Sequence, residues 1–445
     1  MNFEIMHTAL RDGKYVQFVD MLDNMNAVDA AEFLDYVDDS ELLKVFRLLK
    51  KDFAAEIFAE LDTSLQEKII TSITDIEITK LLDELFIDDT VDLLEELPAG
   101  VVNRIIKLST PDIRSEINRF LNYPADSTGS VMTSEFLSIH SDMTVSDAIE
   151  RIRSTGYEKE TIYVIYVTDS SRVLKGTVSL RDLIFSSKDA FIEDIMHTAV
   201  ISAMTLDDKE KAANLISKYD LLALPVVDKE SRLVGILTVD DALDVIEEAA
   251  TEDIEIMAAI SPTDKPYVKT GVFETFFKRI PWLLILLISA TFTGSIITHY
   301  EDALGAAVAL TAFIPMLMDS GGNAGAQASV TIIRGLSLSE IKMSDIFRII
   351  WKEFRVSLLC GATLSAVVFL KILYLDRLSL TIAAVVSLTL LATVIIAKLV
   401  GCSLPVLAKR IGFDPAVMAS PFITTIVDAL SLLIYFRIAS VILKI

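Results

Sequence analysis

The residue with the clearest chemical implication is Asp428, a lone carboxylate in an apolar segment near the C terminus. The thirteen residues from Pro415 to Val427 and the eight from Ala429 to Phe436 are uncharged. A segment of that length can cross a bilayer, and a carboxylate at that depth costs about 2.5–3.5 kcal/mol to insert. Such a group should face water, a partner or an ion. We therefore interpret Asp428 as the marker of a cation path.

A second apolar segment also carries polar side chains near its centre. It runs from Ala303 to Ile333 and contains Pro315 and the polar stretch 319–327. Close helix packing explains the glycines of this stretch, but not its carboxylate and amides. Because an interrupted helix exposes carbonyl oxygens that suit hard cations, we expect a broken helix that lines a cavity here. The candidate ion ligands are Asp319, Asn323 and Gln327 in this segment and Thr424 and Asp428 in the last one.

Five apolar segments are long enough to cross a bilayer. They are Ile280–Tyr300, Ala303–Ile333, Val356–Leu375, Leu378–Val400 and Pro415–Leu443. Basic residues flank alternate ends of these segments, which predicts a multi-pass protein of the plasma (inner) membrane with its N-terminal part in the cytoplasm and its C terminus outside. The first thirty residues have no apolar signal core, so we expect no cleaved signal. The basic residues concerned are Lys278, Arg279, Arg334, Lys342, Arg348, Lys352, Arg355, Lys409 and Arg410.

Charge is divided unevenly along the chain. Residues 263–445 hold 11 of the 63 Asp/Glu residues and 16 of the 40 Lys/Arg residues, which gives this part a net charge of +5. Residues 1–262 therefore hold 52 and 24, a net of −28. Such an acidic part repels nucleic acid and suits cations, and solubility is the alternative reason for it. The two cysteines have no metal or disulfide spacing, and the four histidines accompany no nucleophile pattern, so we predict that the protein is not an enzyme.

The chain from Asp38 to Leu121 falls into units of twelve residues. The units open on cap-like Asp, Ser, Thr or Pro residues and close on apolar positions at helical spacing. Short helices of this kind cannot bury an apolar face alone, so we expect them to stack into a superhelical domain over residues 1–124. Within it Asp88 and Asp92 lie one helical turn apart, which fits either a solvated surface or a metal contact.

A second internal repeat follows over residues 125–247. Val131-Met132-Thr133 recurs as Ile195-Met196-His197, and each copy closes on Gly-x-x-Ser/Thr-x-x-Asp before a helix. Each copy has the pattern β-α-β-β-α, with helices over Val145–Ser154 and Asp207–Tyr219 and strands over Thr161–Val167 and Ala223–Val227. The closing residues are Gly176, Ser179 and Asp182, then Gly235, Thr238 and Asp241.

This repeat resembles a tandem pair of cystathionine-β-synthase (CBS) domains, which are α/β domains. In that family the closing Ser/Thr and Asp often hold the ribose of an adenine nucleotide such as ATP. A hydroxyl and a carboxylate at a strand–helix junction can bond to vicinal hydroxyls, and they can equally cap the helix. The candidate nucleotide ligands are therefore Ser179, Asp182, Thr238 and Asp241.

An acidic helix joins this repeat to the membrane segments and leads into a connecting region over residues 248–275. Carboxylates three or four positions apart repel by a few tenths of a kcal/mol per pair, and no basic residue lies between Asp240 and Lys265. The helix is either a solvated linker or a place where divalent cations bridge its acids to the acidic domains. In the second case, loss of the ion would drive the domains apart. The acids are Asp240, Asp241, Asp244, Glu247, Glu248, Glu252, Asp253 and Glu255.

Two motifs and the domain order resemble the MgtE family of magnesium transporters. The first motif comprises Pro315-Met316-Leu317, Gly322–Gln327 and Arg334-Gly335. The second comprises Asp414-Pro415-Ala416, Pro421-Phe422, Thr424-Thr425 and Asp428. The resemblance implies a multidomain integral membrane protein with an α-superhelical N domain, tandem α/β CBS domains, an acidic connecting helix and an all-α domain of five transmembrane helices over residues 276–445.

The resemblance further implies a homodimeric Mg²⁺ channel in the lipid bilayer, with Asp428 of each subunit binding hydrated ion at the two-fold axis. In that family Mg²⁺ closes the pore by holding the acidic helix against the cytosolic domains. Mg²⁺ keeps much of its water and is usually held by one or two carboxylates, which suits such sites. Asp319 fits either a second pore acid or a residue at the pore mouth, and Asp414 fits a helix cap. The regulatory carboxylates implied are Asp241, Asp244, Glu252 and Asp253, with Asp88 and Asp92 as further contributors.

Two other functions stay open from the residues. Oxygen ligands discriminate poorly among hard cations, so the cargo could instead be Mn²⁺, Co²⁺ or Ca²⁺. Alternatively, the apolar segments only anchor a CBS nucleotide sensor in the membrane. An anchor, however, has no need for Asp428, Asn323 and Gln327.

Overall fold

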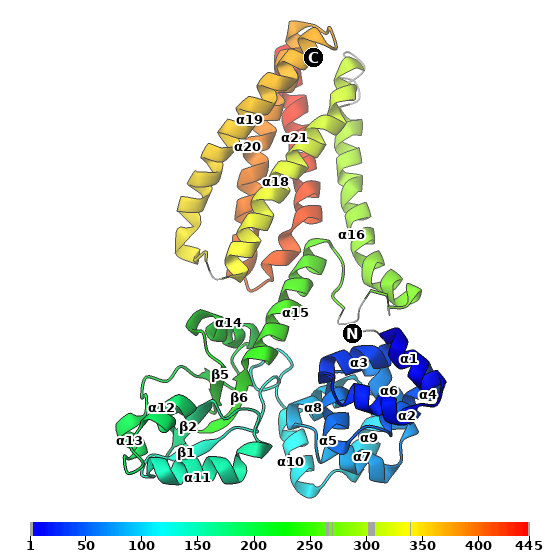
Figure 1. The fold of residues 1–445 in the computed structure, drawn as a ribbon. Helices are drawn as coiled ribbons and strands as arrows, with labels where there is room; N and C mark the ends of the chain where they lie inside the picture. The colour runs from blue at the N-terminus through cyan, green and yellow to red at the C-terminus, as the bar shows by residue number, and fades with distance from the viewer. Residues whose placement is uncertain (1–2, 264–266, 269, 301–307, 339, 444–445) are drawn as a thin grey trace. The chain divides into compact units, whose positions relative to one another are not determined.

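The N-terminal part of the chain is a series of short helices (Figure 1). They begin at intervals of twelve residues, as the sequence predicts. From α4 to α10 the cap residues are Asp38, Lys50, Asp62, Thr74, Phe86, Pro98 and Thr110. The interval extends further upstream than predicted, because α2 and α3 follow Lys14 and Asn26. The helices are α1 (Phe3–Arg11), α2 (Tyr15–Leu22), α3 (Ala27–Asp35), α4 (Asp39–Phe46), α5 (Lys51–Ala59), α6 (Thr63–Ser72), α7 (Asp75–Leu82), α8 (Ile87–Glu96), α9 (Ala99–Leu108) and α10 (Pro111–Phe120).

This computed structural model describes residues 3–263, 267–268, 270–300, 308–338 and 340–443. The chain divides into two compact units, Met1–Ile246 and Glu247–Ile445. In the first unit α5 packs against α3 and α7, α7 also against α9, and α6 against α4 and α8. Each of these helices thus buries its apolar face on the helix two places along, which is how short helices form a superhelical stack.

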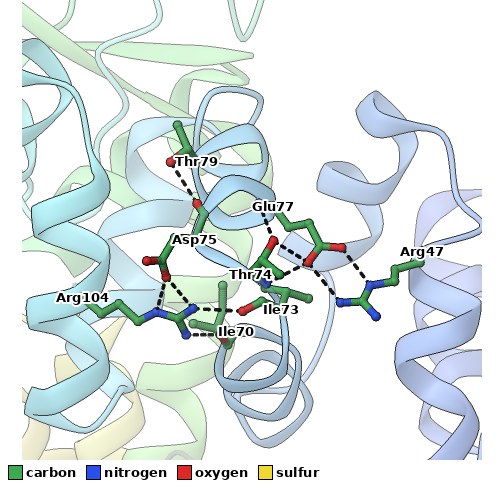
Figure 2. Close-up of polar contacts among 8 residues, drawn as sticks. All are labelled: Arg47, Ile70, Ile73, Thr74, Asp75, Glu77, Thr79 and Arg104. Carbon is green, nitrogen blue, oxygen red and sulfur yellow. Dashed lines mark hydrogen bonds and ion pairs between the residues drawn. The ribbon is translucent and has the colours of Figure 1, made fainter.

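Arg104 shows how successive helices of this stack are held together (Figure 2). From α9 it donates to the Asp75 carboxylate at 2.8 Å and to the carbonyls of Ile70 and Ile73 at 3.1 and 3.0 Å. These carbonyls lie at the end of α6, where a helix leaves its last acceptors without partners. One side chain therefore joins three helices of the stack, α6, α7 and α9.

Glu77 is held from two sides at the start of α7 (Figure 2). It forms a capping box with Thr74, whose backbone amide donates to the Glu77 carboxylate at 2.7 Å. Arg47, which follows α4, makes a two-point ion pair with the same carboxylate at 2.8 and 3.1 Å. The Arg47 hydrogen bond, and after it those of Thr74, lower the pKa of Glu77 to about 2.

Two three-stranded sheets follow, one for each predicted repeat copy. Their strand orders are β1-β2-β3 and β4-β5-β6, and in each the first pair is parallel and the second antiparallel. The predicted β-α-β-β-α pattern is thus confirmed in both copies. The elements are β1 (Ser138–His140), α11 (Val145–Thr155), η1 (Gly156–Glu158), β2 (Val164–Thr168), β3 (Leu174–Ser179), α12 (Leu180–Phe185), α13 (Ile192–Ile195), β4 (Ala203–Met204), α14 (Lys209–Tyr219), β5 (Ala223–Val227), β6 (Leu233–Thr238) and α15 (Val239–Met257).

The recurring Met motif of each copy pairs with the last strand of the other copy. Thr133 bridges Ile236, and His197 bridges Thr177. The closing glycines allow this approach, because a Cβ on Gly176 would lie 2.9 Å from Met196 Sδ and one on Gly235 would lie 2.6 Å from Met132 Sδ. The two copies therefore complete each other.

The second unit consists of long helices. Among the residues described, four stretches are long and apolar enough to cross a membrane: Val272–His299, Met343–Tyr374, Leu380–Arg410 and Pro415–Leu443. The helix over the second predicted segment, α18, is not one of these, and residues 301–307 lie outside the described part. The elements are α16 (Val272–His299), η2 (Val308–Phe313), α18 (Ile314–Ser337), η3 (Met343–Asp345), α19 (Ile346–Tyr374), α20 (Leu380–Arg410), η4 (Pro415–Met418) and α21 (Ser420–Leu443).

The second predicted segment, Ala303–Ile333, is interrupted beside Pro315, because the 3₁₀ helix η2 ends at Phe313 and α18 begins at Ile314. The break predicted at the polar stretch 319–327 is wrong. Helix α18 runs without interruption through the glycine-rich stretch, and Pro315 lies in its first turn. Pro421 likewise lies at the start of α21. At those positions proline removes no helical hydrogen bond, so it marks a helix start and frees no carbonyls in mid-helix.

Candidate ion-binding and nucleotide-binding sites

Glycines of α18 bring that helix into close contact with its neighbours α20 and α21. A Cβ on Gly322 would lie 2.9 Å from Thr424 Cγ2, and one on Gly325 would lie 2.8 Å from Ile423 Cγ2 and 3.2 Å from the Ala397 carbonyl oxygen. Contacts that short leave no room for a side chain. The glycines thus serve helix packing, and they place the polar residues of α18 next to those of α21.

The predicted ion ligands lie on these two helices. Asp319, Asn323 and Gln327 are exposed and recur every four residues, so they form one polar stripe along α18. On α21, Thr424 and Asp428 are half-buried and one turn apart. Asp319 is close enough for its charge to act on the Asp428 carboxylate. The structure thus brings Asp319 and Asp428 together.

The Thr424 hydroxyl has an internal partner. It donates to the Pro421 carbonyl at 2.9 Å, and the Thr425 hydroxyl donates to the same carbonyl at 3.0 Å. Both hydroxyls are therefore bonded to the backbone of the first turn of α21. Asp414 is a cap as predicted, since its Oδ1 accepts from the Ala416 amide at 2.8 Å.

The end of the acidic helix α15 contacts the ends of α18 and η4 within the second unit. Ile256 and Met257 pack against a small core of Ile333, Ala416 and Ala419. Asp253 accepts a hydrogen bond from Ser337 at 3.1 Å. Burial raises the pKa of Asp253, and the nearby charge of Asp414 acts in the same direction. One predicted regulatory acid thus lies beside the helices of the candidate ion path, whereas Glu252 is exposed.

A larger acidic cluster lies in the first unit, where α8 and the start of α15 meet loops of the first CBS copy. Burial raises the pKa of Asp88 well above its usual value, and the neighbouring charges of Asp89 and Asp241 add to the effect. Burial, followed by neighbouring carboxylates, also raises the pKa of Asp89 and of Glu160 to about 7. One oxygen of Asp88 is fully buried without a hydrogen-bond partner among the described residues. These acids are crowded with like charge.

Of the acids predicted here, Asp88 and Asp241 are in the cluster, while Asp92 and Asp244 are exposed at its edge. Four members were not predicted from the sequence, because they come from separate parts of the chain and share no local pattern. Asp89 alone had a signal, because it adjoins Asp88 in an acidic first turn. The members missed are Glu60, Asp89, Glu135 and Glu160.

Within the described part of the chain, no three His, Cys, Asp or Glu side chains converge closely enough to hold a metal ion. The cluster therefore differs from a protein cage for a bare cation. Its side-chain donors are all carboxylate oxygens, the ligand type that hard cations such as Mg²⁺ prefer.

A cavity of about 600 Å³ lies between the two CBS copies. It is lined by Ser179 and Asp182, two predicted nucleotide ligands, together with Arg181, His197 and Tyr166. Ser179 donates to Asp182 at 2.6 Å, and His197 Nε2 lies 3.7 Å from the same carboxylate. The Tyr166 side chain is fully buried, and its hydroxyl has no hydrogen-bond partner among the described residues. The volume and polar groups suit a small polar ligand.

The other two predicted nucleotide ligands do not line this cavity. Thr238 is buried and donates to Asp241 at 2.5 Å, in the arrangement of a helix cap. Asp241 belongs to the acidic cluster. The two repeat copies thus use the same motif differently.

Comparisons with known proteins agree with this arrangement. The MgtE family model, described as a divalent cation transporter, matches residues 314–438, the model of the MgtE intracellular N domain matches residues 25–126, and the CBS domain model matches residues 129–189 and 192–248. The magnesium transporter MgtE of Bacillus subtilis is 35% identical over 97% of this chain and 95% of its own. The chain belongs to the MgtE family. The MgtE of Thermus thermophilus is 36% identical over 99% of this chain and 98% of its own.

Two solved structures, each of the soluble or cytosolic part of a magnesium transporter or channel, resemble just over half of this chain. One is the soluble part of a magnesium transporter, at 30% identity and a TM-score of 0.53, covering 56% of this chain and 98% of that one. The other is the cytosolic domain of the Mg²⁺ channel MgtE in complex with ATP, at 34% identity and a TM-score of 0.52, covering 55% and 100%. The predicted fold, a helical N domain, a CBS pair and apolar membrane-type helices, is confirmed. The family is one of transporters, and the protein is a membrane protein.

Proposed function

We propose that two copies of this chain form a channel that carries Mg²⁺ across the plasma membrane, with cytoplasmic N-terminal domains and an external C terminus. The observation that carries the proposal is the exposed stripe of Asp319, Asn323 and Gln327 beside Thr424 and Asp428. Polar groups at membrane depth are expensive unless they face water or protein. A second copy that covers this side would turn the stripes into the walls of one aqueous path.

The path would hold a hydrated ion. One Asp428 from each copy supplies two negative charges, and Asn323 and Gln327 offer amide oxygens to the water of the ion. Mg²⁺ gives up its water reluctantly, so such ligands suit it without a full protein cage. Asp319, whose charge acts on Asp428, would attract cations to the same path.

The acidic cluster supports a role in gating. Crowded, half-buried carboxylates with raised pKa values are costly to ionise together, and a divalent cation among them offsets that repulsion. Mg²⁺ bound by Asp88, Asp89 and Asp241 would hold the N domain, the CBS pair and the start of α15 together. Because α15 continues to Asp253 beside the ends of α18 and η4, its position would then control the path.

In this scheme the four predicted parts have separate tasks. Residues 1–124 and 125–247 sense Mg²⁺, the CBS cavity at Ser179 and Asp182 binds an adenine nucleotide such as ATP, residues 248–275 connect, and residues 276–445 conduct. The ATP complex of the related cytosolic domain supports the nucleotide assignment.

The test is growth of a Mg²⁺-import-deficient bacterium that expresses the wild type, Asp428→Asn or the control Asp376→Asn. Asp376 lies in the loop after α19, pairs with Lys371 of that helix and is not one of the proposed ligands. We expect rescue by the wild type and the control but not by Asp428→Asn. Equal rescue by all three would exclude the pore role of Asp428.

The family description as a divalent cation transporter favours one alternative, that the cargo is Mn²⁺ or Co²⁺. Uptake of each metal into proteoliposomes separates the two. Faster flux of Mn²⁺ or Co²⁺ than of Mg²⁺, at equal concentration, would establish the alternative.

A further inference from the structure

Three exposed cations form one face at the N-terminal end of α19. Arg348, Lys352 and Arg355 are exposed, and at about 100° per residue they lie within roughly 60° around the helix axis. Trp351 and Phe347, which are 59% and 83% exposed, continue the same side of the helix. We call these five residues the basic–aromatic face.

The positive charge of this face is not balanced by acids among the described residues. None of the three forms an ion pair within the part of the chain that the structure describes. The Arg355 guanidinium lies 5.8 Å from the centre of the Trp351 ring. Glu353, the one carboxylate on α19, turns to α20 instead, where it lies 3.8 Å from Lys398. Because Glu353 and Lys398 are only 13% and 7% exposed, this pair is internal and leaves the face positively charged.

The length of α19 places this face at the membrane boundary. Its 29 residues span about 43 Å, whereas the hydrocarbon core is about 30 Å thick. The excess of about 13 Å corresponds to the first nine residues of α19, which therefore extend beyond the hydrocarbon core. Arg355 is the tenth residue and lies at the edge of the core. Exposed Leu358 and Leu359 follow within the next turn. The side of α19 that is cationic at headgroup level is thus apolar immediately below it.

We propose that the basic–aromatic face binds the headgroup of an anionic phospholipid, with its phosphate on Arg348, Lys352 and Arg355 and its acyl chains along Leu358 and Leu359. Charge complementarity selects the headgroup, because three unpaired cations favour net negative charge over a zwitterion. The rings of Trp351 and Phe347 lie at the depth where aromatic side chains concentrate in membranes. The adjacent leucines favour a lipid over a soluble anion.

The chain permits a direct test, because it has only two tryptophans, Trp282 and Trp351. In the full-length variant Trp282→Phe, Trp351 is the sole tryptophan and reports lipid at the face. The protein is reconstituted in phosphatidylcholine bilayers that contain either brominated phosphatidylglycerol or brominated phosphatidylcholine as quencher. We expect phosphatidylglycerol to quench Trp351 at about a tenth or less of the phosphatidylcholine fraction, since each basic residue near an anionic surface contributes about fivefold.

Two triple variants made in the Trp282→Phe background test whether the three cations of the face cause the preference for the anionic lipid. Arg348→Gln with Lys352→Gln and Arg355→Gln should lower the preference to near one. The control removes three exposed cations from three other places, by Lys342→Gln, Arg377→Gln and Arg410→Gln, and should keep most of the preference. If the first triple variant fails to reconstitute, Arg348→Gln alone should lower the preference several-fold. Equal quenching by both lipids in the parent, an unchanged preference in the variants of the face, or an equal loss in the control would each overturn the proposal.

Discussion

Gly322 and Thr424 pack so closely that a Cβ on the glycine would lie 2.9 Å from the threonine Cγ2 methyl. This contact joins α18 to α21, the two helices that carry all the candidate ion ligands. The width of the proposed path therefore depends on a residue that has no side chain.

Replacement of Gly322 should impair both packing and transport. We expect Gly322→Val to destabilise the membrane unit by about 1–3 kcal/mol and to abolish uptake, because the added atoms push the two helices apart. Gly294 is the matched control, since a Cβ there would meet nothing within 4 Å. Gly294→Val should leave uptake near the wild-type level. Thermal unfolding and Mg²⁺ uptake into proteoliposomes measure the two effects, and full uptake by Gly322→Val would contradict this account.

The acidic cluster predicts that stability without Mg²⁺ decreases as pH rises. The folded pKa values of Asp89 and Glu160 are about 7, above their values in an unfolded chain, so the protonated forms favour folding. The associated stability is fully present below pH 4 and is lost as pH rises through about 7. Unfolding temperatures of the metal-free protein between pH 5.5 and 8 should show this decrease, and Mg²⁺ should reduce it.

Substitutions test whether Asp89 and Glu160 cause this pH dependence of stability. Asp89→Asn with Glu160→Gln should flatten the pH profile and weaken the protection that Mg²⁺ gives to α15 against proteolysis. Asp29→Asn, which removes an exposed acid on α3, should change neither. A pH profile that keeps its full slope in the double variant would show that other groups are responsible.

The interactions of Glu77 predict that stability decreases as pH falls, which is opposite to the dependence expected from the acidic cluster. Its folded pKa is about 2, below the usual value of 4.5, so its contribution is present above pH 4.5 and is lost as pH falls towards 2. Since Glu77 is partly exposed, Glu77→Gln should cost no more than about 1 kcal/mol at pH 7. Acid unfolding followed by circular dichroism should give a smaller difference between wild type and variant at pH 2.5 than at pH 6. An equal difference at both values would mean that the ion pair with Arg47 contributes nothing.

The CBS cavity predicts unequal roles for the two copies of the repeat motif. Ser179→Ala and Asp182→Asn should each weaken ATP binding by about tenfold, as expected when one hydrogen-bonding group is lost. Thr238→Ala should leave ATP binding unchanged, because Thr238 caps α15 and does not line the cavity. Titration calorimetry with the full-length protein measures both. A stronger effect of Thr238→Ala than of Asp182→Asn would place the nucleotide elsewhere.

Elements with a local signal were predicted well from the sequence. The twelve-residue interval identified the helix caps from Asp38 to Thr110, and the repeat motif identified both sheets. The polar stripe on α18 was predicted from Asp319, Asn323 and Gln327, because a carboxylate and two amides are costly in an apolar segment unless they have a function.

Other features had no local signal. Glu60, Glu135 and Glu160 join Asp88 and Asp241 only because distant helices and loops pack together, so sequence spacing carried no trace of them. The break predicted at the polar stretch 319–327 was wrong because α18 continues through it, and the interruption lies beside Pro315, where α18 begins after the 3₁₀ helix η2.

The exchange between the CBS copies makes the unit of folding larger than the unit of repetition. Thr133 exchanges backbone hydrogen bonds with Ile236 at 2.8 and 2.9 Å, and Thr177 exchanges them with His197 at 3.0 and 2.9 Å. A single copy cut from the chain would lose both pairs and leave the edge of its sheet open to association with other chains. A single CBS copy is thus a repeat in sequence but not an independent folding unit, and during synthesis both copies must leave the ribosome before either can complete its sheet.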